Sequence, residues 1–314
     1  MCSRCVARCS NGVGLCKVVD VERGDLYSWR ALYLSVLDVE DIPLFHIGVG
    51  STASRIVVPG SPWACSSCWW ADIVDPRVTV ARPLDNSVIE RIKFYSVDVV
   101  LVDGGEPLVN DWVLGLPDSI RRVLGGGSPN YFVVKTTGAL LEDRLVEASK
   151  YYDGLLFEYT ICVEKPLSIE NVVSILDVSH RLFSIVEIHV PYDGTKKCNI
   201  IVRDLLEEYR DTAIHILPID TEEKILGRAI SLAKELRRKY YSNVYVLGDT
   251  SYSTLDTLCT SCGAINVDRK PWGTALLSRK DNGVIKCWKC GRELRNILIG
   301  HRERKRLVRE IVIW

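Results

Sequence analysis

The fold class of this chain is decided by residues 97–108, which read Val-Asp-Val-Val-Leu-Val-Asp-Gly-Gly-Glu-Pro-Leu. The first six residues form a short, largely apolar run, as expected of a strand buried on both faces. Two glycines then permit a sharp turn and the close approach of a ligand, and proline suits the first turn of a helix. The order is typical of a βα unit and places Glu106 at the carboxyl end of a strand, where barrel enzymes carry their chemistry. An ordinary βα turn is the alternative interpretation.

The same alternation continues on both sides of this stretch. Short apolar or β-branched runs predict strands at residues 54–59, 131–136, 154–159, 184–190, 213–217 and 243–247. Helical apolar spacing predicts helices at residues 86–95, 110–124, 140–151, 169–181, 200–209 and 222–240. Repeated βα units predict an α/β fold with a parallel sheet, which we expect to be an incomplete (βα)6 TIM-like barrel. An open doubly wound sheet is the alternative.

Composition limits the class of protein. The 314 residues carry 40 Lys and Arg against 40 Asp and Glu, and 47% are hydrophobic, which excludes wholesale disorder and argues against a general nucleic-acid coat. The apolar runs are far shorter than the roughly 20 residues that a membrane span needs. The first residues lack an apolar signal core, so we expect a cytoplasmic protein without a membrane partner. The absence of Gln, with Met only at position 1, favours a thermophilic source over a chance bias of composition.

Ten of the twelve cysteines fall in tight groups, and only Cys162 and Cys198 stand alone. Grouped cysteines in a cytosolic protein indicate metal binding rather than disulfides. Two CxxCG knuckles at the C-terminal end predict a four-thiolate zinc ribbon, formed by Cys259, Cys262, Cys287 and Cys290. A second four-thiolate group near the start predicts a knob around zinc or an iron–sulfur cluster, formed by Cys2, Cys5, Cys9 and Cys16. We therefore expect three domains. Residues 1–50 form the N-terminal cysteine knob and a small strand meander, which the alternating apolar run at residues 31–37 predicts. Residues 51–250 form the partial barrel, and residues 251–314 form the zinc ribbon and a basic tail.

A third group holds only two cysteines, Cys65 and Cys68, directly after the first predicted strand of the sheet. By chemistry alone it could be half of a metal site, a redox pair or two buried thiols.

Together with the Gly104-Gly105-Glu106-Pro107 turn, this pair resembles the radical S-adenosylmethionine (SAM) superfamily. In that family a CxxxCxxC motif after the first strand holds a [4Fe–4S] cluster, and a GGEP motif after the second binds the amino group of SAM. The strand end at Thr136 resembles the third-strand motif of the family. The N-terminal cysteines and the Val-Tyr-Val strand before the zinc ribbon are similar to the pyruvate-formate-lyase-activating-enzyme-like group associated with Memo and AMMECR proteins, and we expect an archaeal source.

The resemblance implies an enzyme that generates a 5′-deoxyadenosyl radical on an unknown substrate or target protein. It implies cluster ligands at Cys65 and Cys68 and a SAM site at Gly104, Gly105, Glu106 and Thr136. The sequence departs from the family at Ser61, where the first cluster cysteine belongs, and a hydroxyl is a harder and weaker ligand for iron. The second hypothesis is therefore a catalytically degenerate homologue that acts as a zinc-containing binding or assembly module.

Some polar residues outside these motifs are weaker candidates. His189, His215, Glu158 and Glu187 lie on predicted strands and could face a ligand, although satisfied polar packing is the more common role of a lone histidine. The tail at residues 301–309 is basic and could contact nucleic acid, but interleaved glutamates favour a solvated helix face.

Overall fold

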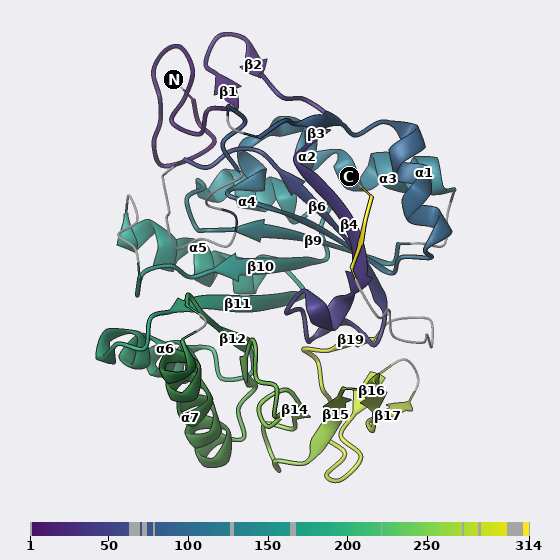
Figure 1. Cartoon of the computed structure of the whole chain (residues 1–314), viewed down its shortest axis with the longest axis vertical. Coiled ribbons are helices and arrows are strands. Elements are labelled where there is room, and N and C mark those ends of the chain that lie inside the picture. The colour runs from purple at the N-terminus through teal and green to yellow at the C-terminus, as the bar shows by residue number, and fades with distance from the viewer. Residues whose placement is uncertain are drawn as a thin grey trace.

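A nine-stranded, mostly parallel sheet organises the computed structural model of the chain (Figure 1). The structure describes residues 2–62, 70, 74–77, 79–125, 129–163, 168–220, 222–271, 273–281, 284–299 and 310–313. From one edge of the sheet to the other, the strands are β13 (Val244–Val246), β12 (Ala213–Pro218), β11 (Ile185–Tyr192), β10 (Gly154–Glu158), β9 (Tyr131–Thr136), β8 (Val99–Gly104), β6 (Thr52–Val58), β4 (Tyr33–Asp38) and β20 (Ile311–Val312).

The seven strands from β6 to β13 run parallel and lie side by side in chain order. The predicted α/β fold with a parallel sheet is therefore confirmed. The last two strands of the order, β4 and β20, are antiparallel to their neighbours. Strand β4 falls in the alternating apolar run at residues 31–37, for which a small separate strand meander was predicted, but it joins the main sheet instead. Strand β20 was not predicted. Because β13 and β20 do not pair within the described part of the chain, the structure shows an open sheet, and the barrel stays a prediction.

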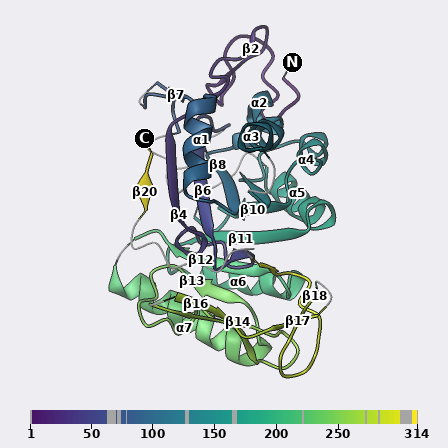
Figure 2. The same ribbon diagram turned by 90° about the vertical axis from the view of Figure 1, so that its right-hand side faces the viewer.

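The α-helices in the described residues pack on one face of the sheet (Figure 2). Their bounds are α1 (Asn86–Phe94), α2 (Asp111–Leu114), α3 (Leu116–Leu124), α4 (Glu142–Ala148), α5 (Ile169–Leu182), α6 (Lys196–Glu208) and α7 (Glu223–Tyr240). Because strand side chains alternate between faces, Val100 and Val102 join the helix core, whereas Val99 and Leu101 join a separate core on the opposite face. A doubly wound sheet would carry helices on both faces, so the one-sided arrangement argues against that alternative.

Local capping decides where several helices begin. The side chains of Asp85, Ser168 and Thr195 each accept a backbone N–H in the first turn of α1, α5 and α6, respectively. Such a cap stabilises a helix by about 1 kcal/mol, and the cap at Thr195 explains why α6 begins before the predicted residue 200. The predicted helix over residues 110–124 is divided into α2 and α3 at Gly115, with Pro117 in the first turn of α3.

The face of the sheet opposite the helices is covered by chain that precedes β6. This stretch contains a short 3-10 helix, η1 (Val39–Asp41), and strand β5 (Ile47–Val49). Leu37 at the end of β4, Val39 in η1, Leu44 in the following loop and Ile47 in β5 enter the core on this face. Residues 33–49, which were predicted to belong to a separate N-terminal domain, therefore contribute strand β4 to the main sheet and also cover one of its faces.

The C-terminal segment forms small antiparallel strand pairs beside β12, β13 and α7 (Figures 1 and 2). These strands are β14 (Thr257–Leu258), β15 (Ile265–Lys270), β16 (Gly273–Leu276), β17 (Arg279–Asp281) and β18 (Val284–Lys286). Strand β19 (Leu298–Ile299) then pairs with β5. The Tyr245 hydroxyl on β13 lies 2.8 Å from Thr257 Oγ1, and Arg237 on α7 donates to the carbonyl of Asp256, so this segment is fastened to the sheet edge. No helix in the described ranges is both long and apolar enough to cross a bilayer.

Candidate functional site

Two loops meet at the carboxyl ends of the neighbouring parallel strands β6 and β8. The backbone N–H of Glu106 donates to the carbonyl of Gly60 at 2.9 Å. A Cβ atom at Gly104, whose φ is +135°, would lie 2.4 Å from a backbone oxygen of β6. A Cβ at Gly105 would lie 2.6 Å from the oxygen of Gly60 and 2.7 Å from Cβ of Ser61. Both glycines are therefore required by the close approach of the loops, which brings Ser61 beside the turn that carries Glu106.

Glu106 is fully buried, and its two carboxylate oxygens have different surroundings. Oε2 accepts hydrogen bonds from Thr136 Oγ1 at 3.0 Å, from the N–H of Thr137 at 2.9 Å and from Thr137 Oγ1 at 2.8 Å. Oε1 accepts no hydrogen bond of normal distance and angle from the described residues, although the N–H of Ala139 lies near enough to influence the carboxyl group. The sequence analysis identified Thr136 but missed Thr137, the next residue of the same strand end.

Burial raises the pKa of Glu106 to about 7, against the hydrogen bonds from Thr137 and Thr136, which lower it. The raised pKa means that the loss of hydration on burial outweighs the hydrogen bonds that stabilise the carboxylate. Perturbed carboxyl groups at strand ends are common in functional sites.

Lys135 lies beside this turn, on the face of β9 opposite the helices. Its Nζ is 2.6 Å from Glu158 Oε2 and 3.6 Å from Asp103 Oδ1, and it donates to the carbonyl of Gly104 at 2.7 Å. Burial alone would lower the pKa of Lys135, but Glu158 and Asp103 outweigh burial and raise it. Lys135 therefore remains an ammonium that is already paired, and it holds the carbonyl of the glycine turn in place.

The predicted cluster ligands Cys65 and Cys68 lie outside the described residues. Of the expected CxxxCxxC positions, only Ser61 is described, and it is half-buried against Gly105.

The four C-terminal cysteines converge as the knuckle spacing predicted. The sulfurs of Cys259, Cys262, Cys287 and Cys290 all lie within 4.8 Å of one another. Each knuckle forms the same kind of turn. The N–H of Gly263 donates to the carbonyl of Cys259, and the N–H of Gly291 donates to the carbonyl of Cys287. Burial raises the pKa of Cys287, but backbone N–H groups outweigh it and lower the value to about 6, which favours the thiolate that a metal needs. The group could therefore hold a metal ion such as zinc.

The N-terminal cysteines are gathered but do not converge. Cys5 and Cys16 are buried, and the sulfurs of Cys9 and Cys16 each lie 3.5 Å from the position of a Cβ at Gly14. Within the described residues, only the C-terminal four bring three or more possible metal ligands within 4.8 Å of one another, so the second four-thiolate centre stays a prediction.

Neither the known protein-family models nor the curated protein sequences contain a match to this chain.

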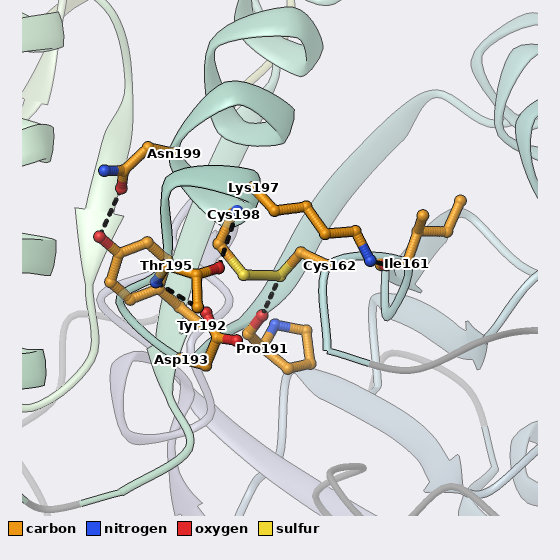
Figure 3. The surroundings of a disulfide bond; sticks show 9 residues. All are labelled: Ile161, Cys162, Pro191, Tyr192, Asp193, Thr195, Lys197, Cys198 and Asn199. Carbon is orange, nitrogen blue, oxygen red and sulfur yellow. Dashed lines mark hydrogen bonds between the residues drawn. A yellow bond between two sulfur atoms is a disulfide. The ribbon is translucent and has the colours of Figure 1, made fainter.

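A disulfide joins the two cysteines that the sequence analysis left alone (Figure 3). Cys162 follows β10, and Cys198 lies in the first turn of α6, directly after β11. The Lys197 ammonium donates to the carbonyl of Ile161 at 2.7 Å and supports the same connection. Because consecutive parallel strands end at the same edge of a sheet, the positions of the two cysteines after neighbouring predicted strands were a usable signal.

A third cluster of polar side chains, which includes His189 and His215, lies on the face of the sheet opposite the helices. His215 Nε2 is 2.7 Å from Glu187 Oε2, and His189 Nε2 is 2.8 Å from the carbonyl of Pro43. Glu187 also accepts the backbone N–H groups of Phe45 and His46, at 2.8 and 2.9 Å. Burial lowers the pKa of His189 to about 3 and that of His46 to about 4, so both rings are neutral.

Proposed function

We propose that this chain is a radical SAM-type protein whose SAM site lies at the carboxyl ends of β6, β8 and β9. The observation that carries the proposal is that Oε1 of the fully buried Glu106 accepts no hydrogen bond of normal geometry from the described residues. A buried acceptor without a partner costs about 1–3 kcal/mol, and more for a charged group, so a ligand that donates there gains this free energy on binding. An ammonium group both donates a hydrogen bond and neutralises the carboxylate, and the amino acid part of SAM carries one.

The surrounding residues are suited to hold such a ligand. Gly104 and Gly105 allow the turn that carries Glu106 to pack against β6 and Ser61, and Thr136 fixes the carboxylate of Glu106 from the side of Oε2. Cys65 and Cys68 would ligate an iron–sulfur cluster, with Ser61 as the third and weaker ligand. When bound, the cluster and SAM supply one-electron cleavage of SAM, which yields a radical able to abstract hydrogen.

A barrel-like curvature of the sheet is part of the proposal. Strands in chain order with helices on one face are the pattern from which (βα) barrels are built. Such curvature would make the face that carries Lys135 and Glu158 concave and would shield a reactive species from water. Lys135 then positions the glycine turn and does not react, because its ammonium group already pairs with Asp103 and Glu158.

A second candidate function rests on Ser61. Because a hydroxyl stands where the family has its first cluster thiolate, the chain could be a degenerate homologue that retains zinc and uses the strand-end site only for binding. The converging C-terminal cysteines favour a metal-containing module in either case.

Anaerobic purification followed by reconstitution with iron and sulfide distinguishes the two candidates. The radical SAM proposal predicts bound iron, a cluster absorption band and 5′-deoxyadenosine formed from SAM after addition of a reductant. A Cys65→Ala/Cys68→Ala double variant should lose the iron and the product while keeping its zinc. Iron-free parent protein with zinc only, after the same reconstitution, would contradict catalysis and support the degenerate module.

A further inference from the structure

A buried amide side chain, which the sequence analysis did not identify, lies beside the four C-terminal cysteines. Asn266 is on β15 and is 0% exposed. Its Nδ2 donates to the sulfur of Cys287 at 3.6 Å and to the carbonyl of Ala264 at 2.9 Å. Cys287 begins the second CxxCG turn, and Ala264 directly follows the first. One side chain is therefore hydrogen-bonded to both turns.

The hydrogen bonds of Asn266 determine which way its amide faces. Oδ1 accepts from Ser278 Oγ at 3.1 Å. Exchanging the nitrogen and oxygen of the amide would set two carbonyl oxygens against each other at Ala264, so the nitrogen must face Ala264 and Cys287. The backbone carbonyl of Asn266 also accepts the N–H of Leu277 at 2.8 Å. The amide is therefore held in place by the protein alone, before a metal binds.

Two further hydrogen bonds join the same two turns at the surface. Trp288 Nε1 donates to a carbonyl of β15 at 2.7 Å, and the guanidinium of Arg292 donates to Ser261 Oγ. Trp288 is 45% exposed, and Ser261 and Arg292 are also exposed. Neither of these hydrogen bonds involves a sulfur. Water competes with hydrogen bonds at the surface, whereas the Asn266 amide is shielded from it, so its bond to Cys287 is worth more.

A donor to a thiolate matters because of the charge of a four-thiolate metal site. Four thiolates around a divalent ion leave negative charge in excess. An N–H group that donates to a sulfur takes up part of this charge and fixes the direction of the sulfur. A neutral amide can do so without competing for the metal, because its nitrogen has no free lone pair.

We propose that Asn266 is a positioning residue of the C-terminal metal site, which joins the two CxxCG turns before the metal binds and donates to the Cys287 thiolate afterwards. The proposal requires that the four cysteines bind a metal. It does not depend on the proposed SAM chemistry, because Asn266 and its partners lie in the C-terminal segment, away from the strand ends that carry Glu106.

Asn266→Asp tests the proposal, because it keeps the size of the side chain and the acceptor for Ser278 but replaces the donor by a negative charge. Competition with a chelator measures the zinc affinity of the full chain. The affinity of this variant should be about 10–100-fold lower than that of the parent, as expected when an outer partner of a metal ligand is lost. Asn86→Asp adds the same charge at the exposed start of α1 and should bind zinc like the parent.

Cobalt(II) in place of zinc separates positioning of the thiolate from general support of the fold. Its complex with thiolates has an absorption band from transfer of charge from sulfur to metal. A sulfur that loses a donor holds its electrons less tightly, so the band should move to longer wavelength in Asn266→Asp and Asn266→Ala. Ser261→Ala removes a link between the two turns that does not involve a sulfur, and the band should stay in place.

Ser278→Ala carries the test if the Asn266 variants do not fold. It leaves the amide in place but removes the hydrogen bond that orients it, and should weaken zinc binding about threefold, as expected for one neutral hydrogen bond. Three results would overturn the proposal. They are zinc affinities of the Asn266 and Ser278 variants equal to that of the parent, an unmoved cobalt band in a folded Asn266 variant, and a parent chain that binds no metal.

Discussion

The carboxylates of two buried glutamates, Glu187 and Glu106, differ in how completely they are hydrogen-bonded. Glu187 has both oxygens occupied, by two backbone N–H groups and by His215. Glu106 has three donors on Oε2 and none of normal geometry on Oε1 among the described residues. A fully paired carboxylate is a structural element, whereas a half-paired one is a site for a donor. This contrast makes Glu106, rather than Glu187, the residue on which the proposed function depends.

The first prediction concerns the pH dependence of stability. With its pKa raised to about 7, Glu106 keeps a proton in the folded state that the unfolded chain, with a pKa near 4.5, releases. The free energy of unfolding therefore falls as pH rises between these two values. Glu106→Gln removes this dependence, so the variant should be more stable than the parent at pH 8 by about 2–3 kcal/mol and equal to it near pH 4. Urea unfolding at the two pH values measures the difference; parallel profiles would contradict the raised pKa.

The second prediction concerns Ser61, which lies against Gly105 at the junction of the two loops. Ser61→Cys should raise iron retention and SAM cleavage after anaerobic reconstitution, because a thiolate is a softer and more readily formed ligand than an alkoxide. Ser61→Ala is the matched control and should not raise either. If the cysteine variant holds no more iron than the parent while zinc is unchanged, the loop has lost more than one ligand and the degenerate module is favoured.

Among the structural elements, the two C-terminal CxxCG turns bring the sulfurs of Cys259, Cys262, Cys287 and Cys290 together. Cys287→Ser should remove about one bound zinc per chain and lower the melting temperature, because the metal loses one of four thiolates. Ser261→Ala, within the other knuckle but not a thiolate, should keep the zinc. Metal analysis of the purified proteins measures both, and full zinc content in the Cys287 variant would contradict the predicted ligand set.

The disulfide between Cys162 and Cys198 connects the loop after β10 to α6 across 36 positions of sequence. Closing a loop of this length restricts the unfolded chain and stabilises the fold by about 3–4 kcal/mol. Cys162→Ala/Cys198→Ala should therefore lower the free energy of unfolding by roughly that amount under non-reducing conditions. A phosphine reductant should destabilise the parent equally and leave the variant unchanged. A parent that is indifferent to the reductant would show that the pair is not bonded in solution.

For the whole molecule, the sequence predicted what local patterns encode. The seven parallel strands of the main sheet and the helices between them were predicted because each is a short apolar run or an amphipathic repeat. The pairing of β4 with β6 and β20 was not predicted. The six residues of β4 and the two of β20 are far apart in the chain, and their sequence does not indicate which edge of the sheet they join. The position of Glu106 at a strand end followed from its motif. The hydrogen bonds to its Oε2 come from Thr136 and Thr137, at the end of the neighbouring strand, and could not be read from that motif.

Other parts of the sites depend on register, which sequence spacing does not reveal. His189, His215 and Tyr245 lie opposite one another on three adjacent strands, so this cluster of side chains arises only when the sheet assembles. The N-terminal cysteines have the spacing of a metal centre but are not held together as one in the described structure. The C-terminal cysteines were predictable because two short knuckles restrict the positions of their own thiolates.

The most direct test of the central claim is the binding of SAM to Glu106. Equilibrium dialysis of labelled SAM against reconstituted protein at pH 8 should show one SAM bound per chain of the parent. Glu106→Gln should weaken binding by at least about tenfold, because it removes the charge that pairs with the ammonium group, whereas Glu142→Gln, at the exposed start of α4, should bind like the parent. Equal binding by the parent and the Glu106 variant, or no binding by the parent, would contradict the proposed site.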